Sequence, residues 1–578
     1  MKNKKYMIAV TFVLAAALLT GCGSVKSSAE TGHATLVKET TSVSETLSVS
    51  TEAISDPITV EEAVSSGTEP ESDEILIALS DSEGSVRITE AGIYRLTGSL
   101  SNGQVVVEAP EDAKVKLILD GVSIRCEGHA AIYAISADKV IVASAEGSTN
   151  LLESVGGFVQ TDDNNVDAAI FAKCDLNLNG DGTIGIRCET GHGVVSKDDL
   201  KVKDGTVSIK AAGQGLSGKD GVTIEGGTIS IVSGTDGIHS ENEDTEKGSI
   251  EILGGSVYIQ SGTDGVDASS SILVDGCNLT AVSGSRNCSD SCKGLKADAD
   301  INVNGGVLTV ASYDDAIHAN GSVTVNGGEM NLASADDGIH ADSELVINDG
   351  QVTVSQSYEG LEAQVITING GVISIVASDD GLNAAGGNDG SNARGPRGGD
   401  PFASDANAIL TINGGTLSVN ANGDGLDSNG QLIVTGGTVY VSGPTSGGNG
   451  ALDYGISASI SGGTVIAAGS SGMAENFGAS SAQGSILLNV GNQAAGTTVT
   501  ITDDSGKDLA SFSPEKSYQT VVISAEGMTL GATYTVTAGS YSETVTLNSL
   551  IVGNGMGGQI GGGPGGQGGF GEGPGGRR

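Results

Sequence analysis

The sequence predicts an all-β protein whose main body is a right-handed parallel β-helix with coils of about 22 residues. Two repeated markers in one register predict this fold, and the composition agrees with it. The chain has 91 Gly but only 9 Pro and no Trp, and its apolar residues are mostly Val, Ile, Leu and Ala. Such a composition is typical of many short strands joined by tight turns.

The first marker is Asn-Gly-Gly, or a close variant, placed directly after a short apolar-polar alternation. It begins at Asn304, Asn326, Asn348, Asn369, Asn413 and Thr435, with steps of 22, 22, 21, 44 and 22 residues. Each unit contains two or three short strands separated by Gly-containing turns. No unit has a helical pattern, which excludes leucine-rich, ankyrin and tetratricopeptide repeats, and propeller blades need longer units.

The second marker is an acidic residue followed by Gly-Ile, Gly-Leu or a variant. Its longer steps predict loops that leave the coil at residues 241–247, 285–292 and about 386–407. The last of these loops carries Arg394 and Arg397, two basic residues on an acidic body. Loops on a rigid scaffold often bind ligands, although a loop without any role fits the pattern equally.

The chain divides into five predicted segments. Residues 1–22 read as a lipoprotein signal peptide, 23–72 as a disordered Ser/Thr/Glu linker, and 73–483 as the β-helix. Residues 484–552 lose the repeat and read as a small antiparallel β unit that caps the exposed strand edges, and 553–578 form a Gly-rich tail.

The N-terminus predicts export and a lipid anchor. Basic residues precede a short apolar run that ends in Leu-Thr-Gly-Cys22, and this run is too short for a standard membrane span. The ending resembles the bacterial lipobox, so Cys22 is the expected lipidation site and the protein is expected on the outer face of the cell membrane. An ordinary signal peptide with a chance Cys is the alternative.

Six further cysteines follow Cys22. Export permits disulfides, and Cys288 and Cys292 share a polar loop with Cys277 nearby in sequence, so one bridge is expected there. The alternative is that several of the six are small buried side chains in the coils.

The formal net charge of −43, from 71 acidic and 28 basic residues, constrains the partners. A chain this acidic repels nucleic acid, so no nucleic-acid partner is expected, and a polyanion partner needs a bridging cation. Calcium is the expected cofactor because hard divalent cations prefer carboxylate oxygens.

The acidic members of the second marker form a column when the coils are stacked. Like charges about 4.8 Å apart repel unless they are solvated or share a cation. An Asp before Gly is also a common turn residue that caps its own backbone, and this explanation competes with metal binding at each single position. The predicted metal ligands are Asp314, Asp315, Asp336, Asp337, Glu359, Asp379 and Asp380.

A second column lies two positions after the glycine of each marker, and strand alternation places it outward. In order it contains His239, Asp267, Lys296, His318, His340, Glu362, Asn383 and Asp427. This strip is predicted either to hydrogen-bond sugars or to be an ordinary solvated face. Zinc at His318 and His340 lacks a third nitrogen or sulfur ligand. The predicted carbohydrate-binding residues are His318, His340, Glu362, Tyr313, Tyr358, Arg394 and Arg397.

Taken together, these motifs resemble the clostridial carbohydrate-binding β-helix family, which is related in fold to pectate lyases and was once a domain of unknown function. The resemblance covers roughly residues 75–550 and rests on the repeated Asp-Asp-Gly-Ile/Leu units and on the stretches 92–98, 117–122, 423–430 and 449–454. It implies binding of polysaccharides, including cellulose and pectic material, with bound calcium. It does not by itself imply turnover.

Three functions therefore compete. The first is a surface-held, non-catalytic polysaccharide binder, although the absence of Trp argues against a flat aromatic platform for cellulose. The second is a calcium-dependent lyase, in which Lys293 would be the base. Neighbouring carboxylates would raise the pKa of this lysine, which suits a base poorly. The third is a structural adhesin.

Overall fold

The structure is a computed structural model that describes residues 58–80, 84–286, 288, 291–385 and 404–553. All described residues belong to one compact unit. This unit is a parallel β-helix that ends in antiparallel strands, so the predicted fold class is confirmed. The described residues contain no α-helix, and accordingly no helix among them is long and apolar enough to cross a membrane.

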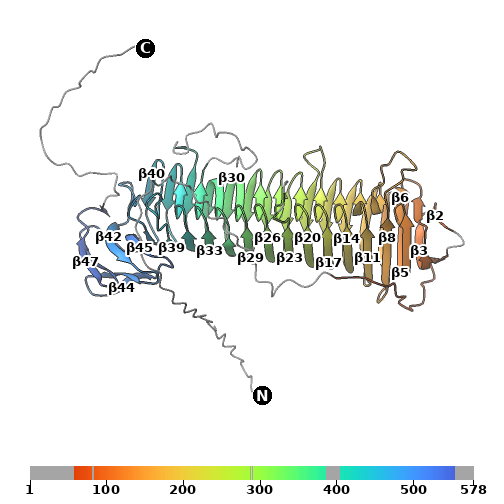
Figure 1. The fold of residues 1–578 in the computed structure, drawn as a ribbon, viewed down its shortest axis with the longest axis horizontal. Helices are drawn as coiled ribbons and strands as arrows, with labels where there is room; N and C mark the ends of the chain where they lie inside the picture. The colour runs from red at the N-terminus through yellow and green to blue at the C-terminus, as the bar shows by residue number, and fades with distance from the viewer. Residues whose placement is uncertain (1–57, 81–83, 287, 289–290, 386–403, 554–578) are drawn as a thin grey trace, which may run out of the picture. The chain divides into compact units, whose positions relative to one another are not determined.

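Each coil contributes strands to three parallel stacks, and Figure 1 shows the successive rungs side by side. The first stack, named here the track face, follows the Asp-Gly markers. Its strands are β2 (Val86–Ile88), β4 (Val105–Glu108), β6 (Ile132–Ser136), β9 (Ala168–Ala172), β12 (His192–Ser196), β15 (Leu216–Gly218), β18 (Ile238–Ser240), β21 (Val266–Ala268), β24 (Leu295–Ala297), β27 (Ile317–Ala319), β30 (Ile339–Ile347), β32 (Leu361–Ile368), β34 (Leu382–Ala384) and β37 (Leu426–Ser428).

The second face follows in each coil, and strands β30 and β32 continue into it from the track face. Its own strands are β1 (Glu74–Leu79), β3 (Gly92–Leu100), β5 (Lys114–Glu127), β7 (Lys139–Ser144), β10 (Asp175–Gly180), β13 (Asp199–Val202), β16 (Gly221–Ile224), β19 (Ser249–Ile252), β22 (Ile272–Val274), β25 (Ile301–Val303), β28 (Ser322–Val325), β35 (Ile409–Ile412), β38 (Gln431–Val434) and β40 (Ser457–Ile460).

The third face completes the coil and follows the Asn-Gly-Gly turns. Its strands are β8 (Thr149–Val155), β11 (Thr183–Cys188), β14 (Thr206–Ala211), β17 (Thr228–Ser233), β20 (Ser256–Ser261), β23 (Asn278–Ser283), β26 (Val307–Ser312), β29 (Glu329–Ser334), β31 (Gln351–Gln356), β33 (Val372–Ala377), β36 (Thr416–Ala421), β39 (Thr438–Ser442) and β41 (Thr464–Gly469).

Both sequence markers have a clear structural role. At the Asn-Gly-Gly turns the second glycine adopts positive φ, for example 95° at Gly328, a conformation that other residues rarely adopt. The asparagines stack into an amide ladder, in which Asn326 Nδ2 donates to Asn304 Oδ1 at 2.9 Å and Asn348 Nδ2 donates to Asn326 Oδ1 at 2.8 Å. The inward Val, Ile, Leu and Ala side chains of the three faces form one continuous core.

The C-terminal end of the coil is covered by antiparallel strands. Strand β45 (Tyr518–Ser524) pairs with β41 and with β42 (Ser485–Gln493), which also pairs with β48 (Ile551–Val552). A separate antiparallel sheet has the order β44-β43-β46-β47, with β43 (Val499–Asp503), β44 (Asp508–Phe512), β46 (Thr533–Ala538) and β47 (Tyr541–Thr546). Strand β45 pairs with the edge of β41 that the last coil would leave open.

The sequence predicts a disordered linker over residues 23–72, but residues 58–66 are docked on the β-helix. This segment, named here the strap, crosses the outside of the third face from later coils towards earlier ones, with Ile58 beside Ser230 and Val64 beside Thr149. Val64 and Thr149 exchange two backbone hydrogen bonds of 2.7 Å, and Arg187 Nη2 donates to the Val60 carbonyl at 2.5 Å. Ser/Thr/Glu-rich composition could not reveal this docking, because the complementary surface lies on residues far along the chain. Residues 23–57 lie outside the described part.

Two loops of the β-helix match the insertions that the irregular steps predicted. One lies between β18 and β19, and the other lies between β23 and β24. The second loop contains a disulfide between Cys288 and Cys292, so the expected bridge is present. Cys126, Cys174, Cys188 and Cys277 are free and buried. Burial raises the pKa of the Cys277 thiol to about 11, which makes this cysteine unreactive.

Candidate functional site

The candidate site is the pair of polar columns on the track face, named here the track. The register confirms that the second column stacks residue on residue, for example His318 on His340 and His340 on Glu362. Its members alternate with core residues such as Ile339 and Ala341, so their side chains leave the apolar core. Burial along the track is nevertheless high, because neighbouring polar side chains cover one another. His340 is 0% and His318 only 7% exposed.

The acidic column is built by hydrogen bonds between successive rungs. In the repeated arrangement, one carboxylate oxygen accepts the backbone N–H of the equivalent residue on the next rung. These bonds join neighbouring rungs, whereas the turn explanation of the Asp-Gly pairs expected a cap within one turn. The bonds are Asp264 N to Asp236 Oδ1 (3.2 Å), Lys293 N to Asp264 Oδ1 (2.7 Å), Asp337 N to Asp315 Oδ1 (2.9 Å), Glu359 N to Asp337 Oδ1 (3.2 Å) and Asp424 N to Asp380 Oδ1 (2.5 Å).

The glycine of the second marker makes this close stacking possible. A Cβ at Gly338 would lie 2.5 Å from the Gly360 carbonyl oxygen and 2.7 Å from the Val354 side chain. A side chain therefore does not fit at Gly338, whereas the preceding rung has Ala316 at the equivalent position. The other carboxylate oxygen of each residue in the acidic column faces side chains of the track. These neighbouring side chains differ from rung to rung.

In the middle of the track, an internal ammonium group compensates the carboxylates. Oxygens of Asp314, Asp315 and Asp336 lie within 4.8 Å of one another. Lys293 Nζ lies 2.9 Å from Asp314 Oδ1 and 2.8 Å from Asp315 Oδ2. Burial would raise the pKa of Asp315, but His318 and Lys293 outweigh burial and hold it far below its usual range. A metal ion at this position would have to displace the lysine.

Lys293 itself is a poor candidate for a lyase base. Its side chain is buried, and although burial alone would lower its pKa, Asp315 and Asp314 raise the pKa well above the usual lysine value. A base must release its proton near the working pH. The ion pairs hold the proton on Lys293, so this residue serves as the counter-ion of the two carboxylates.

The next rungs contain the two stacked histidines. The rings of His318 and His340 are nearly parallel, with centroids 4.8 Å apart. His318 Nδ1 lies 2.8 Å from Asp315 Oδ2, whereas His340 Nδ1 lies 2.9 Å from Glu362 Oε2. Each ring thus has its own carboxylate partner. The pair does not converge on a shared position, which argues against zinc between the two rings.

His340 is the counter-ion of this part of the track. Its Nδ1 also lies 3.3 Å from Asp337 Oδ2, and its Nε2 lies 3.1 Å from Asp342 Oδ1. Burial alone would lower the pKa of His340, but the bonds to Asp337 and Glu362 outweigh it and raise the pKa to about 11. Burial, with the nearby Glu362 and Asp337, also raises the pKa of Glu359 to about 10, so this predicted metal ligand holds a proton at neutral pH.

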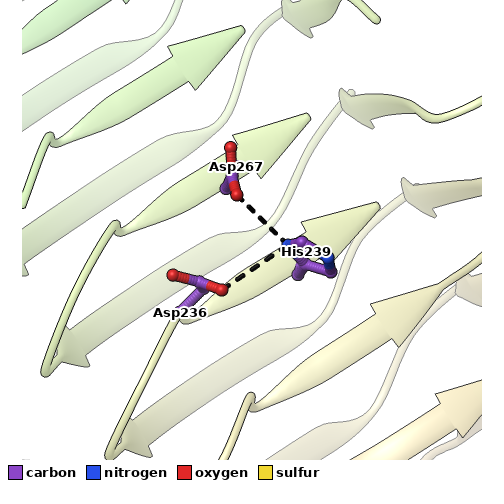
Figure 2. A group of neighbouring side chains, drawn as sticks. All are labelled: Asp236, His239 and Asp267. Carbon is purple, nitrogen blue, oxygen red and sulfur yellow. Dashed lines mark ion pairs between the residues drawn. The ribbon is translucent and has the colours of Figure 1, made fainter. Parts of the chain in front are cut away.

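A third group lies nearer the N-terminal end of the track, and the metal ligands predicted from the sequence do not include it. Figure 2 shows His239 between two carboxylates, with Nδ1 3.3 Å from Asp267 Oδ2 and 3.5 Å from Asp236 Oδ2. These are ion-pair distances without hydrogen-bond geometry. Lys296 Nζ adds a second cation 2.9 Å from Asp267 Oδ1. This group is therefore also compensated from within the chain.

The C-terminal end of the track differs, because the described residues there include carboxylates without a paired cation. Oxygens of Asp380, Asp424 and Asp427 lie within 4.8 Å of one another. Burial, followed by mutual repulsion, raises the pKa of Asp380 to about 7, of Asp424 to about 6 and of Asp427 to about 8. Among the described residues, no Lys, Arg or His is a leading cause of these shifts. Two further carboxyls continue the group, since burial also raises the pKa of Asp453, and that of Glu475 to about 7.

The surroundings of this carboxylate cluster fit a hard divalent cation. Asn383 is the register partner of Asp427, and its buried Oδ1 has no hydrogen-bond donor within the described residues. Its Nδ2 donates to Glu359 Oε2 at 2.8 Å, which fixes the orientation of the amide. At Gly423 an added Cβ would collide with the carboxylates of both Asp379 and Asp380. A donor set made only of oxygens is the kind that calcium prefers.

The remaining predicted site residues have the following positions. Tyr358 is 46% exposed beside the acidic column, where a hydrogen bond to Asp379 and burial raise its pKa. Tyr313 is half-buried, and its backbone N–H donates to the Ser283 carbonyl at 3.3 Å. Arg394, Arg397 and Cys22 lie outside the described residues.

Part of the candidate site was missed when ligands were chosen from the sequence. Asp424 belongs to the acidic column and Asp427 to the second column. Neither is one of the adjacent Asp pairs that were predicted as metal ligands. Asp453 could have been found, because it follows a variant of the second marker in the stretch 449–454. In the structure, Leu452 bridges Leu426 in parallel, which places Asp453 one rung after Asp427. Glu475 follows an irregular coil and carries no repeat signal.

The fold and the track thus define a class of protein, a parallel β-helix with a polar track along one face. The family model of carbohydrate-binding domain-containing proteins matches residues 82–338 and 336–381, which together span more than half of the chain. The chain belongs to this family, as the sequence motifs predicted. The matched region includes most of the track, from His192 to Asp380.

Two individual proteins are also similar to the chain. A carbohydrate-binding domain-containing protein of Acetivibrio thermocellus is 33% identical over 135 residues, which cover 23% of this chain and 47% of the relative. The chain therefore spans about half the length of that curated relative. A solved structure, described as the polysaccharide lyase-like protein from C. thermocellum in a gadolinium derivative, is 26% identical with a TM-score of 0.33. That match covers 48% of this chain and 99% of the solved chain.

Proposed function

We propose that this protein is a cell-surface lipoprotein that binds acidic polysaccharide of the polygalacturonate type along its track, with the help of calcium and without turnover. Membership of the carbohydrate-binding family supports a polysaccharide partner. The stacked rungs support an extended ligand, because they repeat the same polar positions about every 4.8 Å along one face.

The observation that carries the proposal is the uncompensated carboxylate cluster at Asp380, Asp424 and Asp427. The other acidic groups of the track have Lys293, His340 or His239 as internal counter-ions. Calcium would be held by the three carboxylates together with Asn383 Oδ1. When bound, it supplies positive charge that attracts a uronate carboxylate to an otherwise repelling surface.

The absence of turnover is proposed from the state of Lys293. The one lysine in the acidic column is buried and paired with two carboxylates. Its role in the track is that of a counter-ion. A lyase would need a base close to neutral pKa beside the metal, and Lys293 is four rungs away from Asp380 along the acidic column.

The test is a binding assay with polygalacturonate, run with calcium and with chelator. Wild-type protein should bind in calcium and lose at least tenfold in affinity with chelator, whereas Asp424→Asn/Asp427→Asn should show the low affinity in both. Asp349→Asn is the matched control, because Asp349 is an exposed carboxylate on a turn outside the track. Binding in calcium that chelator does not weaken would remove calcium from the proposal.

The same samples test for turnover. Lyase chemistry produces an unsaturated uronate that absorbs in the ultraviolet, and the proposal expects no increase in absorbance with calcium present. Steady product formation would replace the binder with the lyase. The lipid anchor is tested separately, since Cys22→Ser should release the exported protein from membranes into the soluble fraction. A variant that stays in the membrane fraction would contradict lipidation at Cys22.

A further inference from the structure

A pocket of about 340 Å³ lies at the opposite end of the track from the carboxylate cluster. It is formed around β12, β15 and β18, and its polar lining includes His192, Lys197, Ser217, Lys219 and His239. Ser217 and His239 belong to the second column, because β15 and β18 pair in that register. The pocket is therefore continuous with the track.

Both lysines of the lining, Lys197 and Lys219, belong to a column of lysines on successive rungs. Lys173, Lys197 and Lys219 each follow a track strand at the equivalent position. Their backbone N–H groups make the same bond to the preceding rung, to the carbonyls of Ala134 (3.1 Å), Ala172 (2.8 Å) and Ser196 (3.0 Å). Three ammonium groups on successive rungs repel one another, as stacked like charges do. An anion placed among them would remove this repulsion.

The three lysines form no ion pair with a carboxylate in the described part of the chain. In the described part of the chain, the ion pairs of other lysines are well defined, for example Lys139 with Asp175 and Lys247 with Asp220, but Lys173, Lys197 and Lys219 form none. Lys197 Nζ instead lies 5.3 Å from the centroid of the Phe171 ring. This contact holds the ammonium group at the surface without neutralising it.

Other groups in the pocket can also donate hydrogen bonds. The Ser217 hydroxyl has no partner among the described residues. Ser217 lies on the same rung as Lys219 and is the register partner of Val195 on the rung of Lys197. His192 Nδ1 accepts the Gln214 N–H at 2.9 Å, so the neutral ring carries its proton on Nε2. The acidic groups nearby are Glu241 at the rim, Asp167 at 3.8 Å from His192 Nε2, Asp236 and Asp267 beside His239 Nδ1, and Asp162 near Lys173. These carboxylates face the two histidines and Lys173, so the side of the pocket that Lys197 and Lys219 form is cationic on a chain with a net charge of −43.

We infer that Lys197, Lys219 and Ser217 form a calcium-independent subsite for the carboxylate of a uronic acid residue in the bound polysaccharide. This inference rests on the proposed function and names a second anchoring point for the same ligand. His239 and Asp427 are separated by seven rungs, or about 34 Å. An extended polyuronate would meet ammonium groups directly at one end of the track and calcium at the other.

The test uses the full-length protein and sodium polygalacturonate in excess chelator, with binding measured by titration calorimetry. Residual binding by the wild type should weaken as salt is raised, because exposed charges are screened. Lys197→Met/Lys219→Met should lose at least tenfold of this residual affinity. Lys507→Met is the control, since Lys507 is an exposed lysine in the connection between β43 and β44, far along the chain from the pocket. Methyl-esterified polygalacturonate, which lacks the negative charge, should not bind in chelator.

The two proposals fail in different ways. Wild-type protein that binds nothing in chelator, or a lysine variant that binds as the wild type does, would overturn the subsite and leave calcium-dependent binding intact. Asp424→Asn/Asp427→Asn should bind normally in chelator, because its lysine pocket is unchanged. Binding in chelator that depends on the lysines, with no gain on adding calcium, would instead overturn the calcium part of the proposed function.

Discussion

Asp315 Oδ1 accepts the backbone N–H of Asp337 at 2.9 Å, so a side chain of one rung holds the main chain of the next. The same carboxylate faces Lys293 and His318 with its other oxygen. One acidic residue therefore serves both the stacking of the coils and the charge balance of the track. This double role explains why an acidic residue recurs at this position even where no metal is expected.

Replacing Asp315 should destabilise the middle of the β-helix. Asp315→Ala leaves a buried N–H unpaired and strips Lys293 and His318 of a partner, at a cost of about 3–5 kcal/mol. Asp315→Asn keeps an acceptor oxygen and should cost less. Because long repeat arrays can unfold in parts, hydrogen exchange of the amides around Asp337 is the proper measurement. Unchanged protection in Asp315→Ala would contradict the inter-rung role.

His340 should stabilise the fold in a pH-dependent manner. Its pKa in the folded protein is raised to about 11, whereas an unfolded histidine titrates near 6.5. The stability that it contributes is thus complete below about pH 6.5 and is lost as pH rises towards 11. The unfolding midpoint of wild type should exceed that of His340→Gln at pH 7, and the gap should narrow between pH 8 and 10.5. A constant gap over that range would contradict the assignment.

Calcium should stabilise the protein more at pH 8 than at pH 5. The raised pKa values of Asp380, Asp424 and Asp427, about 7, 6 and 8, mean that folded carboxyls hold protons that unfolded ones have lost. Without metal, this end of the track loses stability as pH rises from about 4 to 8. At 100 times its dissociation constant, calcium should restore about 2.7 kcal/mol. Thermal shifts with calcium at both pH values provide the measurement, and an equal shift would count against the cluster.

Gly423→Ala should weaken calcium binding. The added methyl would collide with the carboxylates of Asp379 and Asp380, so at least one must move. We expect at least a tenfold loss in calcium affinity, measured by calorimetry. Gly448→Ala is the matched control, because a Cβ there meets nothing within 4 Å. Equal losses in both variants would indicate a general effect on the loops at this end.

Gly185→Val should release the strap. A Cβ at Gly185 would lie 2.6 Å from Val60 Cβ, so a larger side chain cannot coexist with the docked segment. Limited proteolysis should then cut residues 58–66 faster than in the wild type. Gly157→Val serves as the control, since its Cβ would be in open space. Equal cutting rates in all three proteins would show that the strap does not depend on this contact.

The repeat in the sequence was sufficient to predict the coil and the position of both polar columns. Its period sets the register, so residues such as His318 and His340 had to stack once the fold was a parallel β-helix. The two described loops at the irregular steps followed from the same spacing, and one bridge near Cys277, Cys288 and Cys292 was expected, which the structure places between Cys288 and Cys292. Local period and turn chemistry carry this information, because neighbouring rungs are neighbours in sequence as well.

Only the tertiary structure decided which acidic groups keep an unbalanced charge. Asp315 and Asp380 occupy the same column and look alike in the sequence, but Lys293 reaches Asp315 and no cation reaches Asp380 in the described residues. The difference depends on where long side chains end and on how deeply each carboxylate is buried, and periodicity does not encode either. The strap likewise depends on surfaces that meet across more than a hundred residues, as Ser230 and Ile58 do.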